Sequence, residues 1–172
     1  VSYHPLYDYN LKEAMGRGGL TPFQKFEIMY DLLRGLAAIE KRGFHGDLRI
    51  ENILVRQKKG YCEAVICDLD YFNYKVVFNH PWSAPELLLV PHDQLRPNSK
   101  MDVWPLGAIF FHLLQKKPRR ERFPSINDRD GKLNFKASPE FNQSNIERQI
   151  LRENYSYPIT ELLKGMLKID PK

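Results

Sequence analysis

Residues 44–52 read Phe-His-Gly-Asp-Leu-Arg-Ile-Glu-Asn, and the rest of the chain is best understood from this stretch. Asp47 and Asn52 stand on a predicted loop, directly before an apolar run, residues 53–55, that is typical of a strand. A turn and a second predicted strand follow, and that strand ends at Asp68. Pairing of the two strands in a hairpin would bring Asp47, Asn52 and Asp68 to the same end of it.

Three oxygen-bearing side chains at one end of a hairpin favour the binding of a hard cation. Carboxylate and amide oxygens are the protein ligands that such cations take. The pattern therefore predicts that Asp47, Asn52 and Asp68 bind a magnesium-bound polyphosphate. The alternative is that these residues only cap the loop, as Asp and Asn often do.

Five short motifs, in order along nearly the whole chain, resemble those of the protein kinase family. Residues 45–52 (HGDLRIEN) are similar to the kinase catalytic loop HRDLxxxN, and residues 68–70 (DLD) stand where kinases carry DFG. Residues 84–86 (APE) are similar to the end of the activation segment, and residues 102–107 (DVWPLG) to the start of the large central helix. Residues 166–171 (MLKIDP) are similar to a motif near the end of the kinase domain.

The resemblance implies a mainly α fold with a small β-hairpin, the C-terminal lobe of a protein-kinase-like domain. Residues 1–172 would then be a partial domain. The glycine-rich loop and the strand lysine of the N-terminal lobe have no counterpart in this sequence, which starts about where the hinge between the lobes would be.

The resemblance also implies phosphoryl transfer from Mg-ATP to a hydroxyl of a protein substrate, performed by the parent protein. Asp47 corresponds to the base that orients the attacking hydroxyl and accepts its proton, and Arg49 to a residue that touches the transferred phosphate. Asn52 and Asp68 correspond to magnesium ligands in the ATP site.

Other residues take supporting roles in the resemblance. Leu54 would form the floor under the adenine of ATP, and Cys67 would line the back of that pocket. His45 is expected to donate a hydrogen bond to the backbone near Asp68. Asp102 is expected to accept hydrogen bonds from backbone amides of the catalytic loop, so that its buried charge is paired.

Departures from the kinase pattern keep other functions open. Gly46 replaces the arginine that reads a phosphorylated activation loop, Asp70 replaces a glycine used at positive φ, and the segment over residues 71–83 is short. These features favour a pseudokinase-like scaffold or regulatory binding module. A small-molecule phosphotransferase, whose loop also opens with HGDL, is a further alternative, against which the motifs at 84–86 and 102–104 argue. The acceptor residue also stays open, because Arg49 resembles tyrosine kinases whereas the motif at 166–171 resembles the Ser/Thr branch.

Periodicity and turn signals predict the elements between the motifs. The long helix opens with a capping box formed by Thr21 and Gln24, and a second capping box is expected at Ser99–Asp102. The second box would open the hydrophobic centre of the fold. An apolar stripe on the long helix is expected to be core: Phe23, Phe26, Met29, Tyr30, Leu33, Leu36 and Ala37. The expected elements are helices over 11–15, 102–115, 145–153 and 160–168, a long helix from Thr21 up to Gly43, strands over 53–55 and 64–67, and an irregular insertion over 119–144.

Composition fits one globular domain, since 42% of the 172 residues are hydrophobic and 27% are charged. No apolar run approaches the length of a membrane span, and the two cysteines, Cys62 and Cys67, are not spaced for a local disulfide. We therefore expect an intracellular, cytoplasmic protein. The net charge of +5 permits an acidic partner at residues 116–122, although a solvated basic loop is the simpler interpretation. Aromatic residues do not alternate with these charges, so nucleic-acid binding is not expected.

Overall fold

The computed structural model describes residues 7–70, 72–74, 82–85, 87, 94, 96–115 and 142–169. Several predictions fall on other residues and lie outside the described part of the chain. They concern the basic stretch 116–122, nearly all of the insertion at 119–144, most of the segment at 71–83, Glu86 and residues 170–171.

Three short antiparallel strands form a sheet in the order β1-β2-β3. The predicted hairpin is confirmed as β2 (Ile53–Lys58) and β3 (Tyr61–Ile66), which are longer than expected and are joined through Gly60 at a φ of 94°. The sheet also has a strand that the sequence did not indicate. β1 (Tyr9–Asn10) comes from the expected extended segment and pairs with β2, and the neighbouring Asp8 N donates to Val55 O at 3.1 Å.

The helices lie where periodicity predicts them, with small shifts at their ends. Two short 3₁₀ turns, η1 (Ile50–Asn52) and η2 (Ser99–Asp102), precede β2 and α4. α5 and α6 begin two to three residues earlier than expected. The α-helices of the described residues are α1 (Leu11–Gly16), α2 (Pro22–Glu40), α4 (Val103–Leu114), α5 (Gln143–Arg152) and α6 (Tyr157–Met166).

One of the two predicted capping boxes is present. Gln24 N donates to Thr21 Oγ1 at 3.2 Å, and Thr21 N donates to Gln24 Oε1 at 3.0 Å, which satisfies two backbone donors at the start of α2. The capping box predicted at Ser99–Asp102 is not formed, so that prediction is wrong. The chain enters α4 through η2, whose cap is Asn98, and Ser99 Oγ instead donates to Glu40 on α2 at 3.3 Å.

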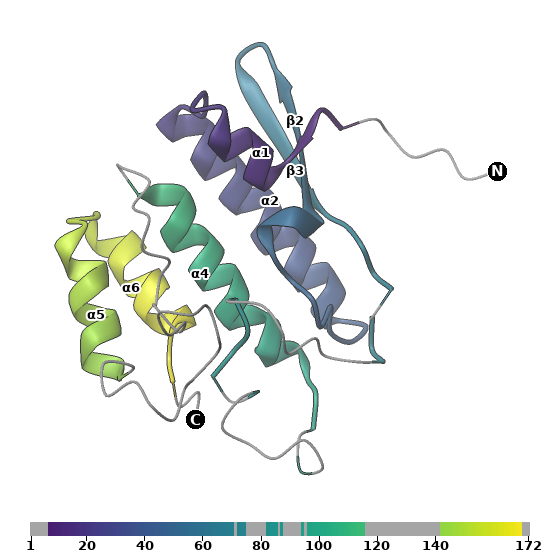
Figure 1. Ribbon diagram of the computed structural model, residues 1–172, viewed down its shortest axis with the longest axis vertical. Coiled ribbons are helices and arrows are strands. Elements are labelled where there is room, and N and C mark those ends of the chain that lie inside the picture. Colours follow the sequence, from purple (N-terminus) through teal and green to yellow (C-terminus); the bar gives the residue numbers. More distant parts are fainter. Residues whose placement is uncertain are drawn as a thin grey trace, which may run out of the picture.

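Helix α4 is the hydrophobic centre, as expected. All its residues from Trp104 to Phe111 are buried, and the helix packs against α2 and α6. Figure 1 shows it between the α2–sheet layer and the α5–α6 pair. The motif at 102–107 therefore starts the element on which both layers pack.

The prediction that the apolar stripe of α2 lies in the core is mostly wrong. Ile28 and Leu32 are buried with Met29 and Leu36 on the face that packs against β3, where Gly35 permits the close approach of Ile66. The aromatic residues lie on another face and are exposed, with Phe23 at 64% and Tyr30 at 62%. Two apolar faces overlap in this helix, so periodicity alone could not tell which one the sheet covers.

Replacement of Gly107 by alanine is expected to lower the free energy of unfolding by about 1–3 kcal/mol, because overpacking strains a close contact. An added Cβ would stand 2.7 Å from Met166 Cβ and 3.2 Å from Leu167, at the crossing of α4 and α6. Gly165→Ala is the control, since its Cβ would meet no atom within 4 Å and alanine favours a helix. Urea unfolding that shows equal stability for Gly107→Ala and wild type would contradict this packing.

Candidate active site

The loop that precedes η1 is fastened to the start of α4 by Asp102. His45 N and Gly46 N donate to the two carboxylate oxygens of Asp102 at 2.6 and 3.0 Å, and this side chain is 2% exposed. Burial raises the pKa of Asp102, and the two N–H donors partly offset that shift. The expected role of Asp102 as an acceptor for the loop is confirmed.

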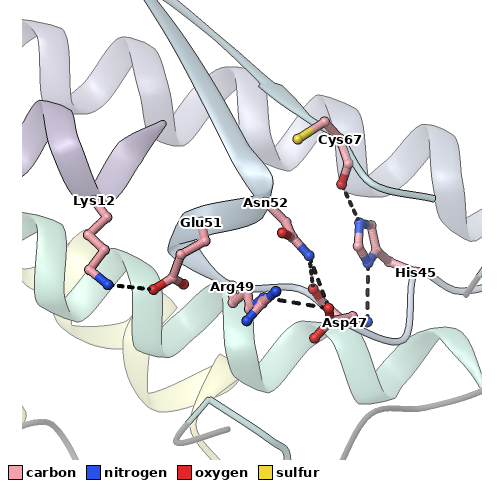
Figure 2. Close-up of polar contacts among 7 residues, drawn as sticks. All are labelled: Lys12, His45, Asp47, Arg49, Glu51, Asn52 and Cys67. Carbon is pink, nitrogen blue, oxygen red and sulfur yellow. Dashed lines mark hydrogen bonds and ion pairs between the residues drawn. The ribbon is translucent and has the colours of Figure 1, made fainter. Parts of the chain in front are cut away.

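His45 joins the loop to the end of β3. Its ring is fully buried, with Nε2 at 2.9 Å from Cys67 O and Nδ1 at 3.2 Å from Asp47 N (Figure 2). A carbonyl only accepts and an amide N–H only donates, so these partners assign the donor role to Nε2 and the acceptor role to Nδ1. The predicted hydrogen bond from His45 to the backbone beside Asp68 is confirmed.

Gly46 explains one departure from the kinase pattern in terms of backbone geometry. Its φ of 82° lies in the left-handed region, where glycine has no Cβ to clash. This conformation accompanies the hydrogen bond from Gly46 N to Asp102. In this loop, glycine suits the backbone path that the anchor requires.

Asp47 and Asn52 are in contact, as the hairpin spacing predicts. Asn52 Nδ2 donates to Asp47 Oδ2 at 3.1 Å and to Asp47 O at 2.9 Å, and both residues are buried (Figure 2). Arg49 Nε lies 3.5 Å from the same Asp47 Oδ2. The Asp47 carboxylate is therefore held between an amide donor and a guanidinium.

The backbone holds Asn52 from both sides. Asn52 N donates to Arg49 O at 3.0 Å within η1, and Cys67 N donates to Asn52 O at 2.9 Å. Both side-chain hydrogen bonds of Asn52 use Nδ2, so Oδ1 has no hydrogen-bond partner among the described residues. That oxygen is a suitable ligand for a hard cation.

Asp68 lies two residues after the end of β3 and is exposed, at a φ of 63°. Aspartate tolerates this region better than most residues. Within the described residues Asp68 forms no hydrogen bond or ion pair with Asp47 or Asn52. The convergence of all three side chains on one cation stays a prediction. The conformational cost expected at Asp70 is absent, because Asp70 does not adopt a positive φ.

The described residues of the site do not include a classical metal cluster. No group of three or more His, Cys, Asp and Glu side chains suited to a metal occurs in the described part of the chain. A magnesium ion here would therefore depend on the Asn52 amide oxygen together with Asp68. These two oxygens suit Mg²⁺, which keeps several waters and takes few protein ligands.

Leu54 and Cys67 border the outer face of the hairpin. Leu54 is half-buried and pairs with the partly exposed Val65, whereas Ile53 and Val55 on the other face are buried. Cys67 is a free, half-buried thiol whose pKa is raised by burial and by the neighbouring Asp68 carboxylate. The half-buried side chain of Leu54 is therefore available for an apolar contact beside the polar loop.

One contact of the loop was missed. Lys12 on α1 forms an ion pair with Glu51 of η1 at 3.1 Å (Figure 2). The two residues lie far apart in sequence, and neither belongs to a local pattern that indicates pairing. Only the fold, which places α1 against η1, brings them together.

Comparisons with known proteins bear on the whole chain. Residues 7–172 match a family model described as "Protein kinase domain". The chain is 32% identical over 135 residues to the MAPK/MAK/MRK overlapping kinase of Mus musculus, an alignment that covers 73% of this chain and 30% of that protein. It is 29% identical over 170 residues to the mitogen-activated protein kinase HOG1 of Ustilaginoidea virens, covering 84% and 45%.

A third similar protein is mitogen-activated protein kinase 3 of Arabidopsis thaliana, 34% identical over 99 residues, with 52% of this chain and 25% of that protein covered. The chain thus spans less than half the length of each of these relatives. Among the described residues, no helix has both the length and the apolar character needed to cross a membrane.

Proposed function

This chain belongs to the protein kinase family, and from that premise we propose that the parent protein transfers a phosphoryl group from ATP to a hydroxyl of a protein substrate. The observation that carries the proposal is the buried Asp47 carboxylate, held by Asn52 and Arg49 in a loop that Asp102 and His45 fasten. Such positioning is the main contribution of a protein to phosphoryl transfer.

Asp47 would orient the attacking hydroxyl and accept its proton. The hydroxyl oxygen then bonds to the γ-phosphorus as the bond to the oxygen of the leaving ADP breaks. The hydrogen bond from Asn52 Nδ2 fixes one carboxylate oxygen, which limits the rotation of the base. Arg49 would place its positive charge beside the transferred phosphoryl group.

Asn52 and Asp68 would hold Mg²⁺ through oxygen atoms. When bound, the ion neutralises charge on the phosphates. Leu54 and Cys67 would contact the adenine at the outer face of the hairpin. We infer that residues 1–172 form the C-terminal lobe and that other parts of the parent complete the ATP site.

One of the three features that favour the scaffold alternative is weakened, because Asp70 is not in the conformation that would demand glycine. Gly46 suits the anchor to Asp102 but supplies no arginine to read a phosphorylated segment, so this feature still favours a scaffold. The third feature, the short segment at 71–83, lies mostly outside the described residues. We favour catalysis, with peptides that present Ser, Thr or Tyr as the substrates that test it and assign the acceptor.

Replacement of Asp68 by asparagine in the full-length protein is expected to weaken Mg-ATP binding by roughly 10- to 100-fold. This range is typical for the loss of metal affinity when a residue around a metal site is replaced. Asparagine removes the charge but keeps the tolerance for a positive φ, so the effect reports the metal and not the backbone. Calorimetric titration with ATP at fixed magnesium measures it. Asp8→Asn is the control, because Asp8 is exposed and accepts one hydrogen bond, from Gln57 N. Equal affinities for wild type and Asp68→Asn would remove Asp68 from the metal site.

A further inference from the structure

A cavity of about 550 Å³ lies beside the catalytic loop and is not used by the proposed phosphoryl transfer. It is open to solvent on one side and is lined by residues of α1, the start of α2, η1 and the end of α4. Met15, Leu20, Ile50 and Leu113 give it apolar walls. This volume is within the range of sites that bind small molecules or peptide side chains.

The charged groups that line the cavity are basic. Lys12 and Lys25 line it, and no Asp or Glu is among the described residues that do so. Lys12 is paired with Glu51 at 3.1 Å. Lys25 forms no ion pair or side-chain hydrogen bond within the described part of the chain, and burial lowers its pKa. An anionic group in the cavity would supply Lys25 with the counter-charge that it lacks.

Gln115 adds a polar group with an unmet requirement. Its side chain is only 9% exposed, and its Oε1 is buried without a hydrogen-bond partner among the described residues. An unsatisfied buried acceptor is costly, and a donor from a ligand would remove that cost. The cavity thus offers a cation, an acceptor and apolar surface together.

We propose that this cavity binds an acidic peptide segment of a partner protein. A carboxylate of the segment would pair with Lys25, a backbone N–H would donate to Gln115 Oε1, and an apolar side chain would pack on Met15 and Leu113. A free inorganic anion would leave Gln115 Oε1 and the apolar walls unused. A purely apolar segment would leave Lys25 and Gln115 without partners.

The position of the cavity connects it to the catalytic loop. Ile50 lines the cavity and begins η1, whose last residue is Asn52. A segment bound there would touch the turn that holds the proposed magnesium ligand. Binding itself needs neither ATP nor turnover, so it can be tested whether or not the proposed catalysis holds.

The test measures fluorescence anisotropy of a labelled peptide, Glu-Asp-Leu-Glu-Leu, with the full-length protein. A neutral analogue, Gln-Asn-Leu-Gln-Leu, is the matched probe. The acidic peptide is expected to bind at least about tenfold more tightly than the analogue, because one charge-assisted hydrogen bond contributes enough binding free energy for that difference. Lys25→Gln should remove this preference and Lys25→Arg should keep it, and Gln115→Leu should weaken the binding of both peptides.

Lys41→Gln is the control, since Lys41 is exposed at the other end of α2 and the change in net charge is the same. Circular dichroism checks that each variant is folded. Equal binding of the two peptides, or equal losses for Lys25→Gln and Lys41→Gln, would overturn the proposal. Displacement of the acidic peptide by inorganic phosphate at the same concentration would also overturn it, because the site would then bind a free anion.

Discussion

Replacement of Asp47 by alanine in the full-length protein is expected to slow phosphoryl transfer by roughly 10²- to 10⁴-fold, the range for a lost general base. The affinity for Mg-ATP should change little. Asn52 keeps its second hydrogen bond, to Asp47 O at 2.9 Å, which does not depend on the Asp47 side chain. The loss should therefore appear in kcat and not in nucleotide binding.

Steady-state kinetics and calorimetry on the same preparations separate the two effects. Asp8→Asn again serves as the control, because it removes an exposed carboxylate without disturbing the loop. An unchanged kcat in Asp47→Ala would show that Asp47 is not the base. A large loss of ATP affinity with kcat preserved would instead assign Asp47 to binding.

Replacement of Asp102 by alanine is expected to lower the free energy of unfolding by about 3–5 kcal/mol, a large effect for one side chain. The change leaves His45 N and Gly46 N buried without their acceptors, and it removes the link between the loop and α4. Urea unfolding monitored by circular dichroism measures the loss.

Asp102→Asn should cost less than Asp102→Ala, since one acceptor oxygen remains for the two donors. Glu161→Ala is the surface control, because within the described part of the chain Glu161 forms only a surface ion pair with Lys164, and such pairs contribute little. A change at Asp102 as small as the one at Glu161 would contradict the anchoring role of this carboxylate.

Features encoded in local sequence could be predicted. The Thr21 cap, the turn between β2 and β3, and the apolar run of α4 each depend on neighbouring residues, and all three are present. The contact of Asp47 with Asn52 also follows from their spacing before a strand. Resemblance to kinases added the roles of His45 and Asp102, whose hydrogen bonds cross long stretches of sequence.

Features that depend on tertiary packing could not be predicted. The exposed face of α2 carries Phe23 and Tyr30, and nothing local distinguishes it from the face that the sheet covers. β1 has only two residues and exists because β2 offers an edge. The Lys12–Glu51 pair and the cavity beside it arise where four elements meet.

The most direct test of the proposed catalysis uses the wild-type full-length protein with γ-labelled ATP, magnesium and a mixture of peptides that present Ser, Thr and Tyr. Label is expected on a peptide hydroxyl, with none when EDTA removes the metal. Binding of Mg-ATP without any transfer to peptide or protein would contradict the assignment of Asp47, Asn52 and Asp68 to a working active site.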